Sequence, residues 1–268
     1  MKRINAGVRW FLVCVLCMLA ANARAADESD KPFAPVEGQP GRDVVWVPTP
    51  AVLVEKMLDV AQVKPEDIVM DLGSGDGRNI IAAAKRGARA VGVEYNPKMV
   101  ELSRSIAEKE GVAEKAQFVE GDMYQADISS ATVLALFLLP ENMDKLVSKF
   151  LALKPGSRIV ANQFSASGWE PDQTGRAEGD CGSWCNWLLY IVPAQVSGRW
   201  RMTQGELELE QKFQMLTGTF TKDGAGTTDV KGRLLGEQIT LTIEGIEYKG
   251  MTGPDNMVGS GWNATRAR

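Results

Sequence analysis

The segment Val-Met-Asp-Leu-Gly-Ser-Gly-Asp-Gly-Arg at residues 69–78 constrains the fold more than any other part of the chain. The apolar residues at its start predict a buried parallel strand. Gly73, Gly75 and Gly77 then allow a sharp turn and leave room for a ligand against the backbone. The helix predicted to follow offers unpaired N–H groups and the positive end of its dipole to that ligand. Asp71 adds an acceptor for a cationic group or a water molecule.

Strands and helices alternate on both sides of this turn. The hydrophobic pattern predicts strands at residues 68–72, 90–94, 117–120, 132–138 and 158–164, and helices near residues 78–86, 97–111 and 141–151. An earlier helix runs to Ala61, with Thr49 as its N-cap and Pro50 at its first position. This order predicts an α/β fold with a Rossmann-like, doubly wound, mostly parallel sheet. A ligand is expected beyond the carboxyl ends of the first strands.

Glu94 ends the second strand, where a carboxylate can accept hydrogen bonds from both hydroxyls of a ribose. The glycines are spaced GxGxG and follow an acid, whereas an NAD-binding turn reads GxGxxG. The pattern resembles motif I of class I S-adenosylmethionine (SAM)-dependent methyltransferases. The likeness covers roughly residues 44–164 and is closest to the small lysine-methyltransferase-like group that includes mitochondrial N-lysine methyltransferases. The stretches that carry it are VPTP, DLGSGDGR, VGVEYNP, FLLPENM and LKPGSRIVANQF.

The resemblance implies a seven-strand methyltransferase sheet with SAM as its cofactor. The residues that it assigns to the cofactor are Thr49, Asp71, Gly73, Gly75, Gly77, Glu94, Tyr95, Asp122 and Met123. Within this set, Glu94 holds the ribose, Asp122 faces the adenine amino group, and Tyr95 or Met123 flanks the adenine ring. Two alternatives stay open: a tight turn that binds nothing, and a solvated carboxylate at Asp122.

The acceptor side is less defined. Amino-methyltransferases for nucleic acids carry an Asn/Asp-Pro-Pro-aromatic motif after the fourth strand, where this chain has Leu-Leu-Pro-Glu at residues 138–141. The difference disfavours methylation of DNA or RNA bases. Catalytic candidates are Asn162, Trp169 and Glu141, and Trp187 is a further candidate for the acceptor pocket. Burial in the core is the common alternative for the tryptophans, and Glu141 can instead complement a helix dipole.

The expected activity is transfer of a methyl group from SAM to an acceptor, with a protein lysine amine as the first candidate. The chain contains no histidine, which is no obstacle because positioning supplies much of the acceleration in such a transfer. Two rival functions remain: an exported, non-catalytic module that binds SAM or a related nucleoside, and a methyltransferase for a small molecule.

Residues 1–25 resemble a secretory signal peptide. Basic residues precede an apolar run at residues 10–20, and an Ala-Arg-Ala site at residues 23–25 predicts cleavage before Ala26. The protein is therefore expected in the periplasm or outside the cell. An uncleaved membrane anchor is the alternative, although the apolar run is short for a membrane span. Export conflicts with the need for SAM, which is made in the cytoplasm.

Net charge and cysteine content limit which partners and metals the protein is expected to bind. Without residues 1–25 the chain keeps 26 basic and 34 acidic residues, a net charge of −8, which argues against nucleic acid as the main partner. Cys181 and Cys185, in Cys-Gly-Ser-Trp-Cys, predict a local disulfide in an oxidising compartment. Two cysteines without histidine make no zinc site, so no metal is expected.

The chain divides by pattern into four parts. We expect a signal peptide over residues 1–25, an extended arm over residues 26–43, a methyltransferase domain over residues 44–203 and a small β-rich domain over residues 204–268. Alternating apolar residues and glycine turns predict an antiparallel β-meander in the last part. Strands at residues 187–192 and 198–202 are expected to complete the methyltransferase sheet as an antiparallel pair.

Overall fold

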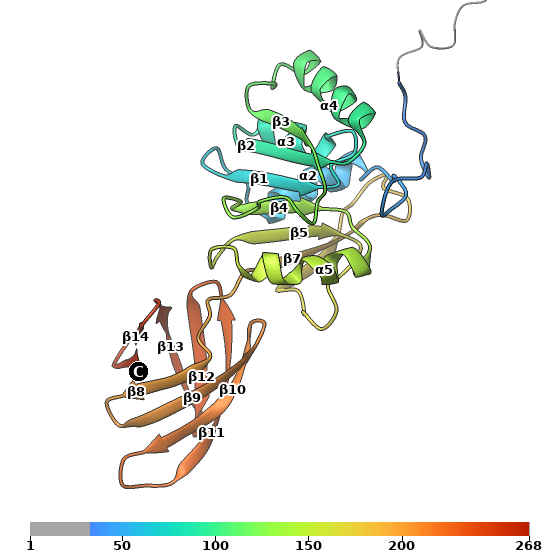
Figure 1. Cartoon of the computed structure of the whole chain (residues 1–268). Helices are drawn as coiled ribbons and strands as arrows, with labels where there is room; N and C mark the ends of the chain where they lie inside the picture. Colours follow the sequence, from blue (N-terminus) through green and yellow to red (C-terminus); the bar gives the residue numbers. More distant parts are fainter. Residues whose placement is uncertain (1–32, 268) are drawn as a thin grey trace, which may run out of the picture. The chain divides into compact units, whose positions relative to one another are not determined.

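The computed structural model describes residues 33–267, so the predicted signal peptide lies outside the described residues. The chain from Pro35 onward forms one compact unit. Within it, a seven-stranded sheet with helices precedes a closed β-barrel along the chain (Figure 1). None of the helices in the described range is long and apolar enough to cross a membrane.

The sheet has the strand order β3-β2-β1-β4-β5-β7-β6. Its first five strands run parallel, and β7 is antiparallel to both β5 and β6. This arrangement confirms the predicted Rossmann-like methyltransferase sheet. The strand order reverses between β1 and β4, so a crevice opens beyond the carboxyl end of β1. The strands are β1 (Ile68–Leu72), β2 (Arg89–Glu94), β3 (Ala116–Glu120), β4 (Val133–Leu136), β5 (Arg158–Asn162), β6 (Gln173–Arg176) and β7 (Asn186–Ile191).

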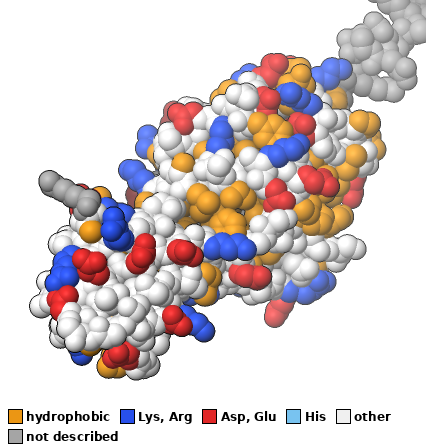
Figure 2. Space-filling view, turned by 60° about the horizontal axis from the view of Figure 1, so that its bottom comes forward, with side chains coloured by type: hydrophobic (Ala, Val, Ile, Leu, Met, Phe, Trp, Pro, Cys, Tyr) orange, Lys and Arg blue, Asp and Glu red, His pale blue; other side chains and the backbone are white. Residues whose placement is uncertain are grey.

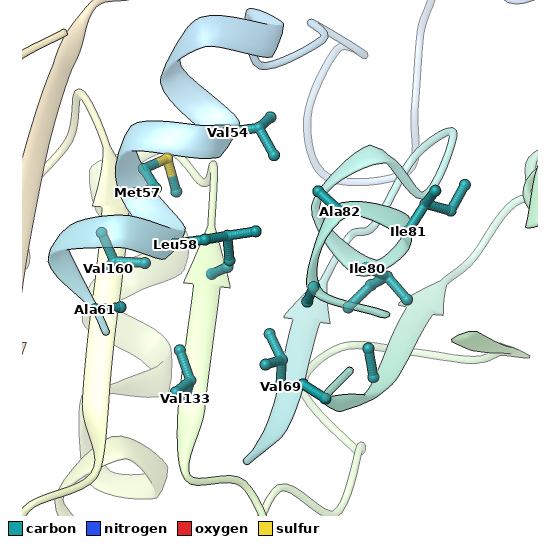
Figure 3. Close-up of a cluster of buried hydrophobic side chains, with 14 of the residues drawn as sticks. Val54, Met57, Leu58, Ala61, Val69, Ile80, Ile81, Ala82, Val133 and Val160 are labelled. Atoms are coloured by element: carbon teal, nitrogen blue, oxygen red, sulfur yellow. The ribbon is translucent and has the colours of Figure 1, made fainter. Parts of the chain in front are cut away.

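Both faces of the sheet are covered by apolar helix faces. One cluster joins Leu58 and Ile80 to Val133 of the sheet, as Figure 3 shows. The opposite cluster joins Phe150 to Leu136. Burial on both faces explains why the central strands are almost wholly apolar. The helices are α2 (Ala51–Val60), α3 (Arg78–Lys85) and α4 (Pro97–Lys109), which contribute to the first cluster, and α5 (Pro140–Leu151), which contributes to the second.

The start of α2 differs from the prediction. Pro50, not Thr49, occupies the N-cap position, and no side chain caps the helix. The carbonyl of Pro50 accepts the N–H groups of Leu53 and Val54. Thr49 is buried, and its carbonyl accepts a hydrogen bond of 2.7 Å from Arg78. Thr49 thus links the start of α2 to the start of α3, next to the glycine turn, a contact that cap preferences do not encode.

The antiparallel end of the sheet also differs from the prediction. The expected strand near residues 187–192 is present as β7, but its outer neighbour is β6. The segment at residues 198–202 is β8 of the barrel instead, because Trp200 and Met202 are buried in the barrel core. The Gln-Thr-Gly-Arg sequence of β6 lacks apolar alternation, which is why pattern reasoning missed this edge strand.

The C-terminal strands form a closed antiparallel barrel rather than an open meander. Along β9, buried Leu207 and Leu209 alternate with exposed glutamates, as a half-buried strand requires. Closure comes from pairing of β15 with β8, which removes the free edges of the sheet. The division at residue 204 stays a prediction. The strands are β8 (Gly198–Met202), β9 (Gly205–Lys212), β10 (Met215–Lys222), β11 (Thr227–Leu235), β12 (Gln238–Ile243), β13 (Ile246–Thr252), β14 (Asn256–Gly259) and β15 (Trp262–Arg266).

The covering of the sheet by α2 predicts a position-dependent loss of stability. Leu58 is fully buried, so Leu58→Ala should lower the free energy of unfolding by about 2–5 kcal/mol, the usual cost of such a truncation. Val52 lies on the same helix and is 38% exposed, so Val52→Ala is the matched control and should cost less than about 1 kcal/mol. Denaturant unfolding followed by circular dichroism measures both, and equal losses would contradict this packing.

Candidate functional site

The glycine turn after β1 is held in place by the carboxylate of Glu94. Its Oε2 accepts the N–H of Gly75 at 2.9 Å, and its Oε1 accepts the N–H of Asn96 at 2.9 Å. Gly77 precedes α3 with φ of +81°, and a Cβ there would lie 2.5 Å from the ring of Phe118. The turn therefore requires glycine at residue 77, and Glu94 fixes it to the end of the second strand.

Asp71 lies beneath this turn, almost without access to solvent. The side-chain amide of Asn79, on α3, donates a hydrogen bond of 2.9 Å to its carboxylate. Burial raises the pKa of Asp71 to about 7, with a further contribution from the negative charges of Glu94 and Asp76. In this structure the partner of Asp71 is Asn79 rather than a cationic group, and its contact with a ligand stays a prediction.

A cavity opens at the carboxyl ends of β1, β2, β3 and β4. It holds about 740 Å³ of space, counting the part open to solvent. The predicted residues that line it are Gly73, Glu94, Tyr95, Asp122 and Met123. The other predicted cofactor residues, which are Thr49, Asp71, Gly75 and Gly77, are not among its lining residues. The cavity thus brings together predicted residues from the ends of β1, β2 and β3, at the edge of the sheet where a ligand was expected.

The segment at residues 38–46 forms one wall of the cavity. It folds back on itself as a small hairpin, because Gly38 donates to the carbonyl of Trp46 at 2.8 Å and Trp46 donates to the carbonyl of Gln39 at 3.0 Å. An isolated bridge between Pro40 and Val45 continues the pairing. Residues 39–47 all line the cavity. The sequence predicted an extended arm over residues 26–43. The part of it that the structure describes folds back as a hairpin instead.

Arg42, in the hairpin, contacts two residues that were predicted to bind adenine. Its guanidinium donates to Asp122 Oδ2 at 3.0 Å and lies 4.5 Å from the ring centroid of Tyr95. The other oxygen of Asp122 accepts the N–H of Tyr124 at 2.8 Å. Since Arg42 and Asp122 stand 80 residues apart, no local sequence signal pointed to this pair. A base that bonds to Asp122 would share or displace the guanidinium.

Trp46 occupies the space above Gly75. Gly75 has φ of +55°, and a Cβ there would lie 2.6 Å from the indole nitrogen of Trp46. In this structure the indole takes the position that a side chain at residue 75 would occupy, and the contact of a ligand with this glycine stays a prediction. A branched substitution at Gly75 would strain the turn as well as meet the indole, so it does not probe ligand binding cleanly.

The acceptor candidates lie in different surroundings. Trp169 is buried and stacks on Phe213 with ring centroids 5.3 Å apart, and Trp187 is buried in the first cluster. Both tryptophans thus follow the alternative of core packing. Glu141 is exposed in the first turn of α5, where it complements the helix dipole. Asn162 is fully buried at the end of β5, and neither of its amide atoms has a hydrogen-bond partner among the described residues.

Sequence reasoning also missed Phe137 as a residue of the cavity. Phe137 follows β4 directly and lines the cavity together with Glu94 and Asp122. The signal that could have found it is its position, because the residue after a central parallel strand lies at the ligand edge of the sheet. The catalytic roles proposed for Asn162, Trp169 and Glu141 stay predictions.

The raised pKa of Asp71 predicts how stability depends on pH. Between about pH 4 and pH 7 the folded state holds a proton on Asp71 that the unfolded chain has released, so this contribution to stability is lost as pH rises through about 7. Asp71→Asn removes the titration. The stability of wild type minus that of the variant should fall by up to about 1.4 kcal/mol per pH unit across this window. Urea unfolding of ligand-free protein at several pH values measures the difference, and a flat difference would refute the buried acid.

Comparison with known proteins identifies the fold and its cofactor. The ANTKMT methyltransferase domain model matches residues 71–173. A protein-lysine N-methyltransferase of Saccharolobus islandicus is 44% identical over 138 residues, which are 50% of this chain and 86% of that protein. The adenine nucleotide translocase lysine N-methyltransferase of Mus musculus is 34% identical over 130 residues, which are 48% of this chain and 56% of that protein.

A solved structure agrees with these relatives. An RNA methyltransferase from Salinibacter ruber, in complex with S-adenosyl-L-homocysteine (SAH), is 41% identical with a TM-score of 0.52 and covers 56% of this chain and 96% of its own. The cavity suits such a ligand chemically, since Glu94 offers carboxylate oxygens to a diol, and Asp122 and Tyr95 offer a hydrogen-bond acceptor and an aromatic ring to a base. The conclusion from the glycine turn, the cavity and the relatives is that this chain belongs to the lysine-methyltransferase-like family of SAM-dependent methyltransferases, in which SAM is the methyl donor.

Proposed function

We propose that this protein methylates the side-chain amine of lysine in another protein. The observation that carries the proposal is the 44% identity to a protein-lysine N-methyltransferase of which the chain covers 86%. The second relative is likewise named for lysine methylation, although this chain spans only 56% of its length. The Leu-Leu-Pro-Glu sequence after the fourth strand agrees with an acceptor other than a nucleic-acid base.

The chemistry asks little of the protein beyond binding and positioning. SAM, when bound, supplies an electrophilic methyl group on a sulfonium. The lysine nitrogen attacks only as a neutral amine, so the acceptor site has to favour loss of its proton. Glu94 and Asp122 would orient the donor from the ends of two strands, and correct orientation supplies much of the rate in such a displacement. The chain has no histidine, so no histidine base takes part.

Methylation of RNA is the rival, because the relative from Salinibacter ruber is described as an RNA methyltransferase. The charge of the chain favours protein: residues 26–268 carry a net −8, and a phosphate backbone is normally bound by a basic surface. Basic and acidic side chains are interspersed on the face that Figure 2 shows. An acidic protein also suits a basic acceptor segment.

The two acceptors can be separated in one assay. Purified protein from residue 26 onward is incubated with tritiated SAM and, in parallel, with a pool of lysine-containing peptides, the same pool with its lysines acetylated, and total RNA. Transfer to free-lysine peptides and not to acetylated ones supports the proposal. Label in RNA alone would overturn it. Small-molecule fractions of a cell extract form a fourth arm, and label found only there would place the acceptor in that class.

The position of Glu94 predicts a loss of cofactor affinity. Glu94→Ala removes the carboxylate expected to accept both ribose hydroxyls, which should weaken SAM binding by about 1.5–3 kcal/mol, or about 10- to 150-fold in Kd. Glu114→Ala, which changes an exposed glutamate outside the cavity lining, is the matched control. Calorimetric titration measures the affinities, and thermal unfolding without ligand checks that loss of the contact with Gly75 has not unfolded the variant. Unchanged affinity would remove Glu94 from the site.

We also propose that the protein is exported and works outside the cytoplasm. The signal-like sequence at residues 1–25 motivates the proposal, and the disulfide between Cys181 and Cys185 is consistent with an oxidising compartment. The bond itself confirms the pairing predicted from the spacing of the two cysteines.

Export predicts two properties of the protein recovered from cells. Its N-terminus should begin at Ala26, and Cys181 and Cys185 should resist alkylation until a reductant is added. Mass spectrometry of the intact protein from the periplasmic fraction, alkylated before and after reduction, measures both. Intact residues 1–25 with the protein in the membrane fraction would favour an uncleaved anchor. Two free thiols on a cytoplasmic protein would refute export.

A further inference from the structure

Three aromatic rings meet at the carboxyl ends of β4 and β5, beside the cofactor cavity. Phe137 follows β4, Phe164 lies just beyond β5, and Trp184 comes from the loop between β6 and β7. The ring centroid of Phe137 lies 5.4 Å from that of Trp184 and 6.2 Å from that of Phe164, and Phe164 lies 6.2 Å from Trp184. All three side chains are partly exposed. We call them the aromatic trio, and Phe137 connects it to the cavity wall.

The backbone before Phe164 is strained and firmly held. Gln163 has φ of +67°, and the N–H of Phe164 reaches back to the carbonyl of Asn162 at 2.7 Å. Such a tight turn on a non-glycine residue costs about 1–3 kcal/mol and persists only where its surroundings enforce it. Asn186 enforces it here, because its carbonyl accepts the N–H of Gln163 at 3.0 Å and its amide donates to Gln163 Oε1 at 3.1 Å.

The disulfide holds the third ring. Cys181 and Cys185 are both buried, with Cα atoms 5.2 Å apart, and the N–H of Trp184 donates to the carbonyl of Cys181 at 3.0 Å. Cys185 is also the chain neighbour of Asn186, the residue that clamps Gln163. One covalent loop therefore positions Trp184 directly and reaches Phe164 through Asn186.

A buried polar group completes the arrangement. Strand pairing puts Ala161 opposite Leu136, so the next pair along the two strands is Asn162 and Phe137. The amide of Asn162 is fully buried and has no partner for its oxygen or its nitrogen among residues 33–267. An unpaired buried amide costs about 1–3 kcal/mol, and in a folded protein it calls for an explanation such as a ligand.

We propose that the aromatic trio and Asn162 form the binding site for the acceptor amine. This inference rests on the proposed function and names the residues that would recognise the end of the lysine side chain. The rings exclude water around the amine, which lowers its pKa and favours the neutral form. They also attract the methylammonium group that forms. The oxygen of Asn162 accepts one hydrogen of the amine and thereby directs the lone pair of the nitrogen.

The transfer balances without a further reactant. The lysine ammonium first releases a proton to solvent. The nitrogen lone pair then forms the new N–C bond while the S–C bond of the donor breaks, and the sulfur keeps the electron pair. Donor becomes SAH, and acceptor becomes a methylated ammonium. The part of the protein in this scheme is the site itself, in which the disulfide acts as a positioning device for the acceptor wall.

A binding experiment tests the trio without turnover. The probe is Nα-acetyl-Nε-trimethyllysine amide, titrated into protein from residue 26 onward that is saturated with SAH. Trp184→Ala and Phe164→Ala should each weaken binding by about 5-fold or more, as loss of a cation–π partner implies. Trp184→Phe should retain most of the affinity. Trp262→Ala truncates a partly exposed tryptophan of the barrel and is the control. The affinity for SAH should stay within about 2-fold of wild type in all four variants.

Variants of Asn162 and of the two cysteines distinguish a role in acceptor binding from a purely structural role. Asn162→Leu replaces an unpaired buried amide by an apolar group of the same branched shape, so the thermal midpoint should rise or stay equal while turnover of lysine peptides falls. The double variant Cys181→Ser/Cys185→Ser should weaken binding of the trimethyllysine probe as Trp184→Ala does and leave SAH affinity intact. In lysine turnover, changes at Trp184 should raise KM more than they lower kcat.

The outcomes separate this inference from the proposed function. If wild type methylates lysine peptides but the alanine variants keep the wild-type probe affinity and KM, lysine methylation stands and the aromatic trio is not its site. Failure of wild type to bind the probe at millimolar concentration also overturns the trio. If wild type methylates RNA and no lysine, the proposed function fails, whatever the trio binds.

Discussion

The cofactor site depends on the hydrogen bonds that the carboxylate of Glu94 accepts from the backbone. By accepting the N–H groups of Gly75 and Asn96, it ties the glycine turn after β1 to the end of β2. The turn would otherwise have several conformations open to it, because glycine restricts the backbone least. A charge-assisted bond to backbone N–H groups is among the stronger hydrogen bonds of a protein. The same carboxylate lines the cavity, so structural support and the predicted ligand contact fall on one residue.

The side chains that stabilise the fold and those expected to bind the ligand lie in different parts of the sheet. Apolar helix faces cover both sides of the sheet, and the chemistry lies where the strands end. Asp71 is the exception, since it is a carboxyl group buried against Asn79 with its pKa raised to about 7. The barrel has its own apolar core, including Trp200 and Leu241. Its side chains fill the interior, as they do in other small barrels.

The N-terminal hairpin and the disulfide loop border the site in different ways. Arg42 brings a positive charge to Asp122 and Tyr95, at the end of the cavity assigned to the base. The loop of Cys181 and Cys185 brings Trp184 to Phe137, at the wall assigned to the acceptor. The pairs Arg42–Asp122 and Phe137–Trp184 each join residues far apart in the chain, so local sequence patterns could not predict them. If export is correct, the oxidising compartment that forms the disulfide also assembles the acceptor wall.

The sequence by itself determined the alternation of strands and helices, the glycine turn and the acids at the strand ends, because apolar period and turn chemistry are local properties. Parallel strands place their carboxyl ends at one edge, so Glu94 and Asp122 could be assigned to one cavity before any coordinates. Only the tertiary structure decided that Trp46 lies over Gly75, that β8 closes the barrel and that Phe137, Phe164 and Trp184 meet. These contacts depend on how distant segments pack, and the apolar period shows which face of an element is buried but not which distant side chain it meets.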